Sequence, residues 1–85
     1  MALSPNDVDR VLSLLRKGRS IEYSTCGGRY TMTWGKRPAT VGAAERFFID
    51  DWQEGTSFVR ELDEAEMRTA LAEAPEEAFR GALRF

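Results

Sequence analysis

Residues 21–34 constrain the fold more than any other part of the chain, with the sequence IEYSTCGGRYTMTW. Two runs rich in β-branched and aromatic residues flank Gly27 and Gly28, and adjacent glycines supply the positive φ angles of a tight turn. We therefore predict a β-hairpin with Ile21 opposite Trp34. This register gathers the apolar side chains on one face: Ile21, Tyr23, Thr25, Tyr30, Met32 and Trp34. An isolated hairpin is marginal in water, so other elements are expected to cover that face.

Helix signals precede the hairpin. Ser4 is a favourable N-cap, Pro5 suits the first helical position, and Leu3 and Val8 have the spacing of a hydrophobic staple. The sequence predicts a helix over residues 5–17. Its apolar residues recur at helical spacing and form one stripe that is expected to pack on the sheet: Val8, Val11, Leu12 and Leu15.

The segment after the hairpin is predicted to contain a loop and then a second hairpin. A Gly-Lys-Arg-Pro run at residue 35 ends the first hairpin and opens a loop to about residue 44. The apolar residues of segment 41–52 have a spacing that fits either a strand or a helix. The Phe-Phe-Ile run that begins at residue 47 favours the strand. A turn at 53–56 then leads to a strand at 57–62 with Phe58 and Leu62 inward.

Two helices are expected at the C-terminal end. Asp63 and Glu66 have the spacing of a capping box, and Pro75 is well placed to open a last helix. The whole pattern predicts one α+β domain over residues 1–85, in the order α-β-β-β-β-α-α. Its small antiparallel sheet combines a hairpin at 20–34 with a second at 46–62, packed against an N-terminal and two C-terminal helices.

The composition excludes several common kinds of site. With no histidine and a single cysteine, Cys26, the chain has no internal disulfide, no structural zinc site and no Ser-His or Cys-His pair. We therefore expect a protein that is not an enzyme and needs no cofactor. The first residues lack the basic and apolar regions of a leader, which suggests a cytoplasmic protein. The dominance of arginine over lysine hints at a bacterial source.

Charge divides the chain unevenly. Residues 1–44 contain seven basic and three acidic residues, whereas residues 45–85 contain five basic and eleven acidic ones. The two halves are expected to complement one another in the fold, and either half could also face a partner of opposite charge. Asp50, Asp51 and Glu54 lie within five residues but lack the spacing of a calcium loop, so we predict no metal site there.

The function predicted from these features is binding of a protein partner, partly through an acidic surface that includes Asp50, Asp51 and Glu54. Small inhibitors, immunity proteins and adaptors work in this way, and the comparison is with these general classes of protein. The alternative is single-stranded nucleic-acid binding at a basic and aromatic hairpin region. Its candidate residues are Arg29, Tyr30, Trp34, Lys36 and Arg37, although the predicted register favours a core position for the two rings. An uncovered strand edge would also permit a homodimer.

Overall fold

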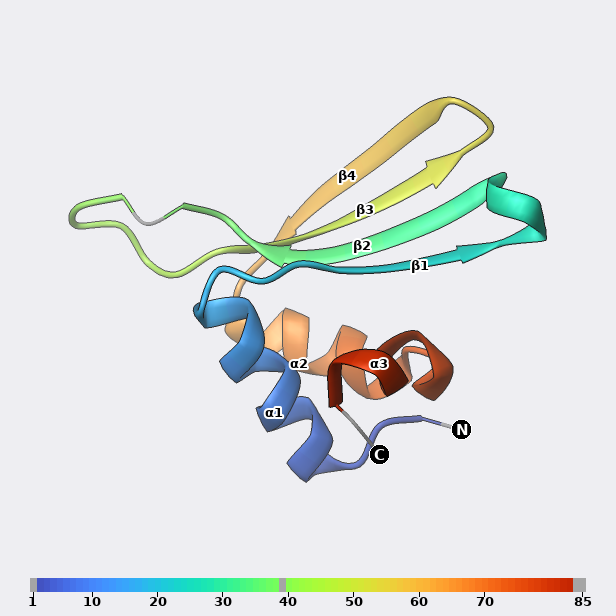
Figure 1. Cartoon of the computed structure of the whole chain (residues 1–85). Coiled ribbons are helices and arrows are strands. Elements are labelled where there is room, and N and C mark those ends of the chain that lie inside the picture. The colour runs from blue at the N-terminus through green and yellow to red at the C-terminus, as the bar shows by residue number, and fades with distance from the viewer. Residues whose placement is uncertain (1, 39, 84–85) are drawn as a thin grey trace.

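The β-branched and aromatic runs of the chain pair into a single antiparallel sheet with strand order β1-β2-β3-β4. The computed structural model describes residues 2–38 and 40–83, and its helices lie on one face of the sheet (Figure 1). The predicted α+β order is confirmed. The elements are α1 Pro5–Arg16, β1 Ile21–Thr25, the 3-10 turn η1 Cys26–Gly28, β2 Tyr30–Lys36, β3 Phe47–Gln53, β4 Thr56–Leu62, α2 Glu64–Glu73, the 3-10 turn η2 Glu76–Phe79 and α3 Arg80–Leu83.

The first hairpin has the predicted register. Ile21 pairs with Trp34, and the ladder continues to Thr25 opposite Tyr30. The connection is tightened by a hydrogen bond of 3.3 Å from the Arg29 amide to the Cys26 carbonyl. Both central glycines have positive φ, as the turn requires. The even-length connection therefore determines which side chains face the helices.

Strand β2 is longer than the sequence indicated. The Gly-Lys-Arg-Pro run was expected to end it at residue 34, yet Gly35 and Lys36 pair with Phe48 and Phe47. A Cβ atom on Gly35 would lie 2.5 Å from the Phe48 ring, so the glycine lets that ring lie on the strand. Strand pairing with β3 overrides the local breaker, and residues 47–53 are strand and not helix.

The capping signals placed the two main helices correctly. The Ser4 hydroxyl accepts a hydrogen bond from the Asp7 amide, and α1 ends at Arg16, one residue before the predicted limit. At α2, the Asp63 carboxylate accepts from the Glu66 amide while the Glu66 carboxylate accepts from the Asp63 amide. Pro75 does not begin a regular α-helix. It precedes a 3-10 turn that leads into the short α3.

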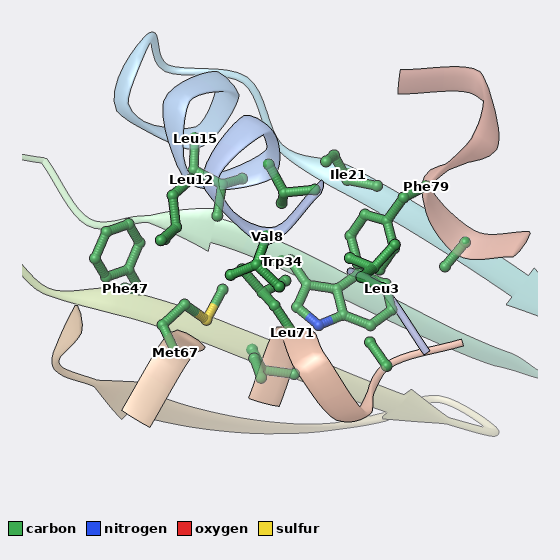
Figure 2. Packing of buried hydrophobic residues seen from close by; sticks show 14 of the residues in the cluster. Leu3, Val8, Leu12, Leu15, Ile21, Trp34, Phe47, Met67, Leu71 and Phe79 are labelled. Atoms are coloured by element: carbon green, nitrogen blue, oxygen red, sulfur yellow. The ribbon is translucent and has the colours of Figure 1, made fainter. Parts of the chain in front are cut away.

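The core lies between the helices and one face of the sheet (Figure 2). Trp34 is 1% exposed, and the centroid of its indole lies 4.8 Å from that of the Phe79 ring at an interplanar angle of 57°. The helices contribute the remaining large aliphatic side chains. The described residues that are less than 2% exposed and largest in volume are Trp34, Phe47, Phe79, Leu12, Leu15, Met67, Leu71, Leu83 and Val11.

The helices leave the far end of the sheet bare. Leu62 is buried as predicted. Phe58 was also predicted to be buried, and this prediction is wrong, because its side chain is 58% exposed. Phe58 pairs with Asp51, so it lies on the same face as the core. Alternation correctly identified the face, but it carries no information on how far along the strand the helices extend.

Ion pairs connect the basic and acidic parts of the chain. Arg16 binds the carboxylates of both Glu45, at 2.7 Å, and Glu64. Arg68 contacts Asp9 at 2.6 Å and Glu64 at 3.2 Å. The network joins α1, α2 and the β2–β3 loop, which supports the expectation that the two halves complement one another. The hydrogen bond from the Arg16 guanidinium holds the pKa of Glu45 below its usual range.

This shift predicts a pH-dependent stability contribution. Because the pKa of Glu45 is lower in the folded state, its ion pair stabilises the fold above the unfolded-state pKa of about 4.3 and loses that effect as pH falls through the folded-state pKa. Replacing Glu45 with Gln should cost at most about 1 kcal/mol at pH 7, since both partners are partly exposed. The difference in melting temperature should shrink as pH falls below the unfolded-state pKa and disappear once the carboxylate is protonated in the folded state as well.

Glu73→Gln is the matched control, because the ion pairs of the described residues do not include Glu73. It should show no such pH-dependent difference. A Glu45→Gln penalty that stays constant from neutral to acidic pH would show that the ion pair is not its cause.

Candidate functional site

The face of the sheet opposite the helices is not covered by the helices. No helix or strand of residues 2–38 and 40–83 packs on it (Figure 1). We call it the open face. Strand register and alternation assign it these residues: Glu22, Ser24, Thr31, Thr33, Gly35, Phe48, Asp50, Trp52, Ser57, Val59 and Glu61.

The charge of the open face has one sign. Its strand residues include the carboxylates of Glu22, Asp50 and Glu61 and no lysine or arginine. At its rim, the Arg37 guanidinium lies 5.0 Å from the Phe48 ring centroid and 3.1 Å from a Glu61 oxygen. The open face therefore presents acidic and hydroxyl groups around aromatic rings.

A shallow hollow of about 400 Å³ lies on the open face. One row across the strands places Thr33 between Glu22 and Asp50, and the next row places Thr31 between Ser24 and Trp52. The hollow is lined by Glu22, Ser24, Gly28, Thr31, Thr33, Asp50 and Trp52. It thus combines two carboxylates with one indole ring and three hydroxyl groups.

Hydrogen bonding within this hollow is incomplete. The Ser24 and Thr31 hydroxyls lie 2.9 Å apart and bond one another. Ser57 donates to Asp50 Oδ2 at 3.5 Å, the limit of such a bond. Asp50 Oδ1 is buried and has no partner among the described residues. A buried carboxylate oxygen without a donor is costly, so Asp50 is held in the hollow at some expense of stability.

The three carboxylates singled out in the sequence do not share a surface. Asp50 lies on the open face, whereas Asp51 lies on the helix side and accepts a hydrogen bond of 3.1 Å from the Gln53 side chain. Glu54 occupies the β3–β4 turn, with a φ of 47°. The described residues hold no group of three or more carboxylates and thiols that could bind a metal ion.

The candidate nucleic-acid residues are separated as well. Trp34 is buried, while Tyr30 is 40% exposed, so the expected core position holds only for the first. Arg29 and Tyr30 lie at one end of β2 and Lys36 and Arg37 at the other, about 20 Å apart at the usual rise of a strand. The five residues therefore do not form one stacking groove.

A larger hollow of about 640 Å³ lies in the β2–β3 loop. Both acidic residues that line it are already paired, Glu45 with Arg16 and Glu61 with Arg37. It is lined by Lys36, Arg37, Pro38, Thr40, Ala43, Ala44, Glu45, Arg46 and Glu61. These two ion pairs join the loop to α1 and to β4.

Sequence reasoning missed three residues of the open face. Glu22 and Glu61 lie about forty residues apart in the sequence, and only the strand order places them on the same face as Asp50. Trp52 was considered for its helical spacing and not as a surface ring. Strand parity in the second hairpin would have placed Trp52 beside Asp50, because residues i and i+2 share a face.

Comparisons with protein-family models, with curated proteins and with solved structures find no match for this chain. Among the described residues, no helix has the length and apolar character needed to cross a membrane.

Proposed function

We propose that this chain is a non-catalytic interaction domain whose open face binds a protein partner through basic side chains of that partner. The observation that carries the proposal is the hollow in which the carboxylates of Glu22 and Asp50 lie with the partly exposed Trp52 ring, with no lysine or arginine among its lining residues. Inhibitor, immunity and adaptor proteins use acidic surfaces to attract basic partners.

The chemistry of the hollow favours an arginine of the partner. A guanidinium has five donors and stacks on aromatic rings, and the hollow offers an indole together with the carboxylates of Asp50 and Glu22. Glu22 lies in the same row, one strand beyond Thr33. Charge-assisted hydrogen bonds to either carboxylate would be stronger than neutral ones. The hydroxyls around them can satisfy the remaining polar groups.

The proposal is tested with a short peptide that alternates arginine and serine. Trp34 is buried and Trp52 is partly exposed, so a change in tryptophan fluorescence on titration reports the open face. Binding should weaken as salt rises, because screening reduces the attraction between exposed charges. Replacing Asp50 with Asn should weaken binding about tenfold.

Asp51→Asn is the matched control, since it removes the same charge one residue away on the other face of the sheet. Its affinity for the peptide should stay within about twofold of the parent. Equal losses in the two variants would leave net charge as the only cause and would reject the open face as the site. A single-stranded oligonucleotide that binds at low salt, and binds Asp50→Asn more tightly, would replace the proposal with the nucleic-acid alternative.

A further inference from the structure

Strand β4 forms a free edge of the sheet. All seven of its residues pair with β3 on one side, and no described residue pairs with it on the other. Proteins commonly protect such edges with proline, lysine or a bulge. Strand β4 has no proline, lysine or bulge. Other charged side chains can also protect an edge, but the two on β4, Arg60 and Glu61, have opposite signs, so they do not repel every strand that could pair there. The edge is thus open to pairing with another strand.

Two apolar side chains are exposed on opposite faces of this edge. Phe58 is 58% exposed on the helix side, and Val59 is 50% exposed on the open face. A partner lying on one face would cover only one of them. A strand added at the edge places side chains beside both at once, in addition to pairing the free backbone groups.

We propose that β4 pairs with β4 of a second copy of this chain, antiparallel and about a two-fold axis through Val59. An antiparallel pairing centred on Val59 uses all seven residues of the strand. It places odd-numbered residues opposite odd-numbered ones and even opposite even, so the same face of each sheet continues across the interface. Phe58 then lies opposite Arg60 of the second copy, which allows a cation–π contact. Glu61 lies opposite Ser57 of the second copy.

Charge and the length of the pairing together select this register, because centring on Phe58 also opposes no like charges but pairs only five of the seven strand residues. Centring the pairing on Arg60 or on Glu61 would place two like charges opposite one another, which is unfavourable in a sheet. Centring on Val59 opposes no like charges, and the strand is therefore complementary to itself. That self-complementarity is the reason for naming a second copy as the partner.

The arrangement of the helices fits the same symmetry. The far half of β4 extends beyond the helices (Figure 1), and a hollow of about 290 Å³ lies beside it, lined by Met32, Ile49, Asp51, Phe58, Val59 and Arg60. A two-fold axis through Val59 brings the bare end of one strand beside the Leu62 end of the other, where α2 begins. Each copy would then shield the exposed Phe58 of the other. This inference does not rest on the proposed function.

Cross-linking tests the register directly. In a Cys26→Ser background, Val59→Cys places two thiols opposite one another at the axis, within the Cα separation that a disulfide needs. Mild oxidation should give a covalent dimer of the 9.6 kDa chain at least about tenfold faster than for Val41→Cys. Val41 is the matched control, since it is fully exposed in the β2–β3 loop. Equal rates for the two variants would overturn the proposed register.

Sedimentation tests the dimer itself. The parent should sediment as a reversible dimer, and Val59→Lys should raise its dissociation constant about tenfold or more, because two lysines would meet at the axis. Val41→Lys adds the same charge and should leave the constant unchanged. Melting curves should show both variants folded. A parent that remains a monomer up to about 1 mM would overturn the proposal.

Discussion

Replacing Trp34 with Ala should lower the free energy of unfolding by about 3 to 5 kcal/mol, the largest effect expected for a single substitution in this chain. The indole is 1% exposed and packs on Phe79, so its removal leaves a cavity bounded by both layers of the fold (Figure 2). Small domains have only about 5 to 15 kcal/mol of stability in total. The variant should therefore unfold at a much lower urea concentration than the parent.

Trp52→Ala provides the control for this experiment. It removes the same side chain from the open face, where no element packs on it, and should cost less than about 1.5 kcal/mol. Urea unfolding followed by circular dichroism compares the two variants without relying on tryptophan fluorescence. Similar midpoints for the two would show that the Trp34 ring is not the centre of the core.

Local signals were sufficient to predict most elements of this fold. The Gly27–Gly28 turn and strict alternation determined the first hairpin, because a shift of one residue would have mixed apolar and polar side chains on both faces. The side chains at Ser4 and Asp63 mark helix starts through hydrogen bonds to nearby amides, which depend on few distant residues. Turns and helix caps depend on interactions between residues close in sequence, so they can be predicted from the sequence.

The errors concern interactions between distant segments. Gly35 stays in β2 because Phe48, thirteen residues later, packs on it. Phe58 stays exposed because α1, α2 and η2 cover only part of the sheet, a limit set by helix length and connection. Neither fact is encoded in the residues next to Gly35 or Phe58.

The candidate site depends on the same distinction. Asp50 and Asp51 are adjacent in sequence, and the pleat of a strand sends adjacent side chains to opposite faces. Once the segment is identified as strand, their separation follows. That Glu22 and Trp52 lie near Asp50 cannot be predicted in this way, because it depends on the order in which β1, β2 and β3 pair. The acidic character was predictable, whereas the surface that carries it was not.

The second large effect is expected at the turn of the first hairpin. Gly28 has a φ of 91°, Gly27 a φ of 68°, and the preceding Cys26 also has a positive φ. A Cβ atom at Gly28 would meet nothing within 4 Å, so a side chain there collides with no neighbour and its whole cost is backbone strain. Gly28→Val should therefore lower the free energy of unfolding by about 1 to 3 kcal/mol.

Two further variants separate strain from other causes. Asn populates the left-handed region more readily than other residues, so Gly27→Asn should be tolerated at a φ of 68° and ψ of 24°. Gly81, in α3, also has open space at its Cβ position but no positive φ, and Gly81→Ala should not destabilise the fold. Denaturant midpoints measure all three. If Gly28→Val unfolds at the midpoint of the parent, the left-handed turn does not hold the hairpin, and the register that places Trp34 in the core has another origin.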